Sequence, residues 1–137
     1  MNIFDIEKLP YSEFGSSIPR KVRLVISPET TGEDRVAIVQ VKIPPGGISE
    51  GHFHLESDEY ILFEHDGAVI LDGKRHEVTK GSLVHAVKGV MHECINTSTN
   101  EDLNLTCVFV PPFEPYGKYP ELIKRTRDYL KNTGTNE

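Results

Sequence analysis

The sequence from Gly46 to Gly67, GGISEGHFHLESDEYILFEHDG, contains a strand-like run preceded by two closely spaced histidines. The run, Glu59–Glu64, is apolar and aromatic and has the length of a strand. His52 and His54 are two residues apart, so on a strand both imidazoles leave the same face. Imidazole is the most common metal ligand in proteins. This stretch therefore predicts a β-structure with a candidate metal-binding pair at its start.

A carboxylate can complete this pair only if the chain changes direction. Glu59 lies five residues after His54, and this odd offset would place it on the opposite face of a straight strand. We therefore expect a bend or bulge at Glu56–Asp58, whose serine and aspartate suit a turn. His92 lies at the start of a later strand-like run, which antiparallel pairing can bring alongside the other three residues.

Three neutral imidazoles and one carboxylate suit a divalent transition metal. Fe, Mn, Ni, Co, Cu and Zn all accept such ligands, and the sequence does not choose among them. Ligand chemistry alone leaves open a chance pair of histidines on an exposed strand.

Strand-like runs recur on both sides of this stretch at nearly even spacing. They are Arg20–Ile26, Val36–Ile43, Glu59–Glu64, Ala68–Leu71, Arg75–Val78, Leu83–Val87, Met91–Asn96 and Leu103–Val110. Asp72-Gly73 is a two-residue hairpin signal, and we expect Ser27–Asp34 to be a loop. No long helical pattern separates the runs. The pattern therefore predicts an antiparallel sandwich or barrel and not a βαβ sheet.

The C-terminal segment has a different period. Residues Glu121–Lys131 place apolar side chains at helical spacing, which predicts one amphipathic helix. We expect this helix to cover an end or edge of the barrel, with a role in an oligomer interface as the alternative. Asn132–Glu137 is expected to fray.

Composition excludes several classes of protein. The 137 residues include 21 acidic and 15 basic side chains, a net charge of −6, and a length that fits one domain over residues 1–137. The acidic balance argues against nucleic-acid binding, and no apolar run is long enough to span a membrane. The N-terminus lacks the pattern of a signal peptide, so we expect a cytoplasmic protein. Cys94 and Cys107 are too few for a disulfide framework or a thiolate zinc cluster.

Two spaced motifs add a family resemblance. Gly46 to Gly67 closely resembles the first cupin motif, G(X)5HXH(X)3,4E(X)6G, with one extra residue before the final glycine. The sequence GSLVHAVKGVMHECIN resembles the second motif, G(X)5PXG(X)2H(X)3N, and matches it at Gly81, Gly89, His92 and Asn96. The resemblance extends over about Val36–Val110. It implies an all-β, single-domain antiparallel jelly-roll β-barrel followed by the short C-terminal helix. It also implies a metal site whose ligands are His52, His54, Glu59 and His92.

The sequence departs from the motifs at two places. Val87 stands where the second motif has proline, which removes no ligand. The extra residue after Glu59 predicts a bulge near Phe63–Asp66. If that residue is counted upstream instead, Asp58 becomes the carboxylate ligand. We favour Glu59 because its spacing from His54 fits the motif and its side chain is longer.

The side chains that line the barrel depend on which face of each strand points inward. If Gln40 and Lys42 faced inward, they would offer polar groups to a substrate. We favour the opposite arrangement, with both in solvent and the Val/Ile face in the core, because unpaired lysine is seldom buried. We expect Cys94 to be a small buried residue, with a redox-sensitive thiol near the metal as the alternative. His85 is expected either in the core or in support of a metal ligand.

The resemblance implies a function only in outline. Cupins include dioxygenases, decarboxylases, lyases and sugar isomerases, as well as proteins with no known catalysis. We expect a metal-dependent enzyme acting on a small carboxylate, enediol or sugar, and no catalytic residue can be named. The alternatives are a non-catalytic binding or sensing protein and a barrel with a vestigial site. Small cupins are commonly dimeric, so we expect a homodimer in which Arg20–Ile26 pairs across a two-fold axis.

Overall fold

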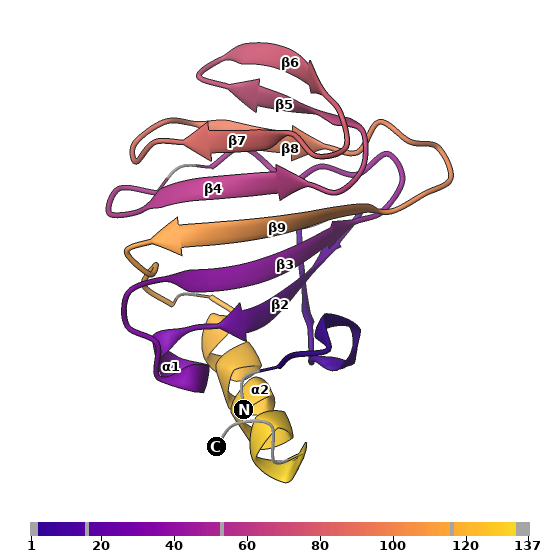
Figure 1. The fold of residues 1–137 in the computed structure, drawn as a ribbon. Helices are drawn as coiled ribbons and strands as arrows, with labels where there is room; N and C mark the ends of the chain where they lie inside the picture. Colours follow the sequence, from indigo (N-terminus) through magenta and orange to yellow (C-terminus); the bar gives the residue numbers. More distant parts are fainter. Residues whose placement is uncertain (1–2, 16, 53, 116, 134–137) are drawn as a thin grey trace.

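The computed structural model describes residues 3–15, 17–52, 54–115 and 117–133. These residues form strands with one short helical segment before the first strand, another after the second strand, and a longer helix at the C-terminal end (Figure 1). The elements are η1 (Ile6–Lys8), β1 (Ser12–Phe14), β2 (Arg20–Ile26), α1 (Pro28–Thr31), β3 (Ala37–Ile43), β4 (Asp58–Phe63), β5 (Gly67–Leu71), β6 (Lys74–Val78), β7 (Leu83–Ala86), β8 (His92–Ile95), β9 (Leu103–Val110) and α2 (Tyr119–Thr133).

The strands form two antiparallel sheets. The larger sheet has the order β1-β2-β3-β9-β4-β7, and the smaller one has the order β6-β5-β8. Figure 1 shows the smaller sheet at one end of the molecule and α2 below β2 at the other. Isolated bridges join Ile48 to Ile95 and His52 to His92, so the segment after β3 runs along β8. This is the predicted all-β jelly-roll barrel with a short C-terminal helix.

The core lies between the inward faces of the sheets because strand side chains alternate. Along β9 every second residue is buried, from Leu103 to Phe109, and β9 pairs in continuous register with β3. Phe63 of β4 and Val69 of β5 extend this core toward the smaller sheet.

The Asp72-Gly73 hairpin is confirmed. Leu71 pairs with Lys74, so the connection between β5 and β6 has the two predicted residues. Asp72 and Gly73 have φ values of 51° and 82°. Both therefore adopt the left-handed conformation that the tight hairpin turn requires.

The structure corrects the expected loop at Ser27–Asp34, which contains the helical turn α1. The Ser27 hydroxyl accepts a hydrogen bond from the Thr30 N–H, and Pro28 occupies the first turn. Gly32, with a φ of 79°, ends the helix. The sequence Ser-Pro-Glu-Thr-Thr-Gly contains the N-cap serine, the first-turn proline and the C-terminal glycine of such a turn. A four-residue helix is too short to show a helical period, so the segment was predicted as a loop.

The N-terminal strand β1 was also not predicted. Its three residues pair with the first half of β2, where Ser12 opposes Val22 and Phe14 opposes Arg20. That part of the β2 edge is therefore already paired within the chain. The homodimer stays a prediction and would need a surface other than this edge.

Helix α2 is longer than the sequence predicts. It runs from Tyr119 to Thr133, so Asn132 and Thr133 are helical where fraying was expected, and residues 134–137 lie outside the described part of the chain. Leu122 is fully buried in the main core, and Leu130 packs with Leu9 and Val25 in a smaller apolar cluster. The helix therefore covers one end of the barrel. No helix among the described residues is long and apolar enough to cross a membrane.

We expect Leu122→Ala to lower the free energy of unfolding by about 2 to 5 kcal/mol, because it leaves a cavity where a fully buried side chain packs. Urea denaturation measures this change. Lys124→Ala, on the exposed face of the same helix, is the matched control and should change the free energy by less than about 0.5 kcal/mol. Equal stability of the two variants would contradict a covering role for α2.

Candidate metal centre

Three separate segments carry the four residues singled out in the sequence. His92 is the first residue of β8, and His52 lies beside it in the preceding loop. The two residues exchange backbone hydrogen bonds in both directions, at 3.0 and 2.9 Å. His54 follows, and Glu59 is the second residue of β4. Backbone pairing thus holds His52 and His92 side by side, although they are far apart in the sequence.

A bend between His54 and β4 brings Glu59 to the same side. The chain bends at Leu55 and Glu56, one residue earlier than predicted, before β4 begins at Asp58. The Ser57 hydroxyl donates a 2.7 Å hydrogen bond to the Pro111 carbonyl and fixes the entry into the strand. The expected change of direction is therefore present.

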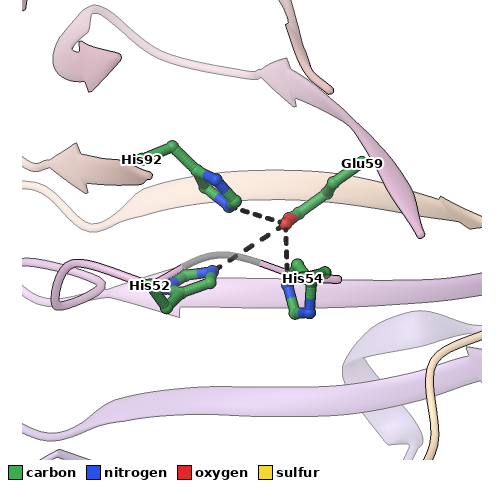
Figure 2. A group of neighbouring side chains, drawn as sticks. All are labelled: His52, His54, Glu59 and His92. Carbon is green, nitrogen blue, oxygen red and sulfur yellow. Dashed lines mark hydrogen bonds and ion pairs between the residues drawn. The ribbon is translucent and has the colours of Figure 1, made fainter. Parts of the chain in front are cut away.

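The four side chains converge on one point (Figure 2). Glu59 Oε1 lies 2.8 Å from His92 Nε2, 3.3 Å from His54 Nε2 and 3.8 Å from His52 Nε2. One candidate ligand atom from each residue lies within 4.8 Å of the others. Glu59 and His92 are buried, and His52 and His54 are half-buried. We call these four residues the His/Glu cluster.

The ring orientation of two histidines is fixed by backbone carbonyls. His52 Nδ1 lies 2.8 Å from the Glu50 carbonyl, and His92 Nδ1 lies 3.1 Å from the Val90 carbonyl. A carbonyl can only accept, so in each ring Nδ1 carries the hydrogen. Nε2 of each ring then faces the centre of the cluster, where it donates to Glu59 when it carries a proton and can bind an ion through its lone pair when the ring is neutral, as in metal-binding histidines whose other nitrogen is anchored.

Charge in the cluster is concentrated on Glu59. Burial by itself would raise the pKa of its carboxyl, but the three imidazoles that face its Oε1 outweigh burial and hold the pKa well below its usual value. At His92 burial would lower the pKa, and the hydrogen bond and charge of Glu59 raise it instead. The cluster is thus built around an ionised carboxylate.

The donor set fits a transition metal. His54 Nε2 is buried and has no hydrogen-bond partner within the described residues, although Glu59 Oε1 is near. A buried imidazole nitrogen without a partner is costly unless something else binds it. Three imidazole nitrogens and one carboxylate oxygen are ligands that Fe, Mn, Co, Ni, Cu and Zn accept.

Asp58, the alternative carboxylate, lies outside the cluster. Its carboxylate accepts a hydrogen bond from the Lys88 N–H at 2.9 Å and lies 3.1 Å from His85 Nε2. These two contacts lower the pKa of Asp58. Because neighbouring strand residues face opposite sides, Glu59 points into the barrel and Asp58 points out.

His85 lies neither in the core nor against a metal ligand, so both expectations for it were wrong. It is exposed on the outer face of β7, where its ring stacks on Tyr60 at a centroid distance of 4.4 Å. Val84 and Ala86 are the buried residues of this short strand. The larger apolar residue Leu83 shares the exposed face with His85, which is why the apolar pattern indicated the wrong side.

The extra residue between Glu59 and Gly67 causes no bulge in β4. The pairing of β4 with β9 stays in register from Asp58 to Phe63, and the chain bends at Glu64 and His65. A Cβ atom at Gly67 would lie 2.9 Å from the Ile95 carbonyl oxygen. The motif glycine is therefore required by close approach of β5 to β8, and the additional residue is accommodated in the connection before it.

A cavity of about 320 Å³ opens beside the His/Glu cluster. Val39 and Val41 of β3 line it, as the favoured arrangement requires, and Gln40 and Lys42 do not. Gln40 is nevertheless buried, which corrects the expectation that it faces solvent. On the outer side of the sheet Gln40 accepts a hydrogen bond from Arg23, and Lys42 pairs with Glu7 at 2.9 Å.

Two cysteines line the cavity. Cys94 is buried as predicted, and Cys107 of β9, which the sequence analysis did not place there, lines the cavity too. Burial raises the pKa of the Cys94 thiol to about 12 and that of Cys107 well above its usual value, and the Glu59 charge adds to both effects. Both thiols are therefore protonated near neutral pH. Alternation with Leu105 and Phe109 was the signal that could have placed Cys107.

We expect both thiols to be unreactive in the folded protein. With a pKa of about 12, only roughly one Cys94 in ten thousand is thiolate at pH 8, whereas an ordinary thiol is substantially ionised. A colorimetric disulfide reagent should therefore modify neither cysteine within minutes at pH 8, and should modify both once guanidinium has unfolded the chain. Rapid reaction of native Cys94 would favour the redox-sensitive alternative.

A known family accounts for the fold and the cluster together. The family model described as a cupin domain matches residues 39–109, about half of the chain, and this range contains all four cluster residues. The chain belongs to the cupin family.

One known protein is similar to this chain in sequence. An uncharacterised protein, L612, of Acanthamoeba polyphaga mimivirus is 27% identical over 85 residues, which cover 59% of this chain and 53% of that protein. The chain thus spans about half the length of this relative.

Solved structures of three other proteins resemble the fold at low sequence identity. A predicted oxalate decarboxylase from Thermotoga maritima has a TM-score of 0.70 at 19% identity and covers 80% of this chain and 98% of its own. KdgF from a Halomonas species has a TM-score of 0.63 at 17% identity, covering 77% and 88%. An RmlC-like cupin from Shewanella frigidimarina has a TM-score of 0.63 at 18% identity, covering 80% and 88%.

Proposed function

We propose that the protein is a metal-dependent enzyme acting on a small oxygenated substrate, and that the His/Glu cluster holds one divalent transition-metal ion. The observation that supports this most directly is the convergence of three imidazole nitrogens on the Glu59 carboxylate at the wall of a cavity. An ion bound there would supply Lewis-acid polarisation of a substrate oxygen and, as iron or copper, chemistry with dioxygen. Dioxygenase, decarboxylase or lyase, and isomerase reactions are all compatible with these ligands.

The residues of the chain would hold the ion and shape the space in front of it. The Glu50 and Val90 carbonyls orient His52 and His92, so little reorganisation accompanies binding. The buried Glu59 carboxylate supplies the one negative charge of the set. Apolar side chains on β3, β4 and β9 form much of the cavity wall in front of the ligands.

We expect protein purified without an affinity tag to contain about one transition-metal ion per chain, as the four donors predict. His92→Ala and Glu59→Gln each remove a buried member of the cluster and should lose most of that metal. His52→Ala removes a half-buried member, so it tests the same site with less risk to the fold. Elemental analysis measures the metal content and identifies the ion.

Two control variants test whether metal is lost because the cluster is disrupted or merely because a carboxylate or an imidazole has been removed nearby. Asp58→Asn removes the neighbouring carboxylate on the other face of β4, and His85→Ala removes an exposed imidazole. Both should keep the metal content of the wild type. Unchanged metal in the His52 and His92 variants, or loss of metal in Asp58→Asn, would overturn this assignment.

A non-catalytic binding or sensing protein is the second candidate. Outside the His/Glu cluster, the ionisable side chains among the described residues that line the cavity are Arg20, Glu50, Cys94, Cys107 and Tyr119. An arginine and protonated thiols do not act as general bases near neutral pH. Glu50 and Tyr119 are then the proton-transfer groups left among these residues, and Glu50 lies beside Arg20. An arginine-paired carboxylate favours binding of an anion over proton transfer, which supports a binding protein as the second candidate.

The reaction class can be tested with the metal-loaded protein and a panel of 2-oxo acids, diketones and catechols. Dioxygen consumption that depends on both substrate and His52 indicates an oxygenase. Anaerobic turnover indicates a lyase, decarboxylase or isomerase, and the ion decides whether redox chemistry is available, since zinc has none. Saturable binding without turnover under either condition would support the sensing protein over the enzyme.

A further inference from the structure

One arginine faces the cavity from the strand nearest the N-terminus. Along β2, Arg20 and Val22 line the cavity, whereas Lys21 and Arg23 leave the opposite face of the strand. The Arg20 side chain is only 18% exposed. Histidines aside, it is the cationic side chain among the described residues that line the cavity.

Arg20 and Arg23, on opposite faces of β2, differ in how their hydrogen-bond donors are used. Arg23, three residues further on, donates to the Leu9 carbonyl at 3.1 Å and to Gln40 Oε1 at 3.3 Å, as expected of a structural arginine. Within the described residues the Arg20 guanidinium makes no hydrogen bond, and its ion-pair partner, Glu50 Oε1, lies 3.7 Å away. A half-buried guanidinium with free donors is suited to a planar anion such as a carboxylate.

A carboxylate already lies beside this guanidinium. Glu50 is 53% exposed and has a φ of 62°, which is uncommon for a residue other than glycine. A Cβ atom at Gly15 would lie 2.7 Å from Glu50 Oε1, so the glycine leaves room for that carboxylate. The Glu50 carboxylate therefore lies in the space next to Arg20 that the carboxylate of a ligand would take.

The rest of the wall favours an apolar body over a polyol. Its side chains include Val22, Val39, Val41, Ile61, Leu105 and Phe109. A sugar in this space would lose hydrogen bonds to water from several hydroxyl groups and find few partners in exchange. A short hydrocarbon or aryl group would instead gain from burial.

We propose that Arg20 binds the carboxylate of the ligand and that the ligand is a small carboxylic acid with an apolar body, not a sugar. This inference rests on the proposed function in that the same cavity is the substrate site, and it names the substrate class. Glu50 competes with the ligand for the guanidinium. Arg20 would contact the substrate directly and determine its specificity for a carboxylate.

The test is binding of three probes, measured by calorimetry on the full chain, both metal-loaded and stripped with a chelator. The probes are 4-methyl-2-oxopentanoate, its uncharged methyl ester, and glucuronate, which keeps the carboxylate but replaces the apolar body by a polyol. The wild type should bind the oxo acid roughly tenfold or more tighter than either of the other two. Failure of the wild type to bind the acid at millimolar concentration would overturn the proposal.

Two variants on adjacent positions of β2 give the matched comparison. Arg20→Met should remove the preference for the acid over its ester, whereas Lys21→Met deletes the same charge on the other face, beside Tyr11, and should keep it. Glu50→Gln should tighten acid binding roughly two- to fivefold by removing the competitor, and it provides a test if Arg20→Met does not fold. Equal discrimination in Arg20→Met and the wild type, or tighter binding of glucuronate, would overturn the inference.

The stripped protein distinguishes this inference from the proposed function. If the cluster binds no metal but the acid preference persists and depends on Arg20, the metal proposal fails and the carboxylate site stands. If metal is bound and the preference is absent, the carboxylate site fails and the metal proposal stands.

Discussion

The ionised carboxylate of Glu59, buried at the junction of the two sheets, is the constraint on which the rest of the site depends. Taking a carboxylate out of water costs several kcal/mol unless partners offset it. Three imidazoles do so, and two of them are held in place by backbone carbonyls. Their arrangement in turn requires the reciprocal backbone pairing of His52 with His92, which fixes one segment of the loop after β3 against β8.

Elements far apart in the sequence complete the cavity around this point. The central strands β3, β9 and β4 turn one face inward and provide the apolar wall. β1 and α2 cover the end of the barrel, and Arg125 of α2 holds them together through hydrogen bonds to Tyr11 and Ser12. Strand β1 also brings Phe14 to the wall of the cavity, beside Arg20. The motif segments thus provide the cluster, and the flanking elements provide much of what a ligand would meet.

Local spacing predicted most of the strands and the His52–His54 pair, whereas the full set with Glu59 and His92 followed from the resemblance to the cupin motifs. Histidines two apart, the bend before Glu59 and the Asp-Gly hairpin need only neighbouring residues to be recognised. The burial of Gln40 depends on Arg23 and Asn104, which come from other strands, so no local pattern could reveal it. The exposed face of β7 was misread because Leu83 is larger and more apolar than Ala86, although the smaller residue is buried. Side-chain packing across the sheets decided these positions.

Charge balance links the two proposed parts of the cavity. A divalent ion held by neutral imidazoles and one carboxylate would leave one positive charge at the cluster. Arg20 adds a second, and the Glu50 carboxylate at the mouth cancels only one of them. In a space with apolar walls such an excess is poorly screened, so it favours entry of an anion and disfavours a cation. A monocarboxylic acid would neutralise the excess and displace Glu50 toward water, where its exposed side chain already lies. A neutral sugar would leave both the guanidinium and the charge unmatched.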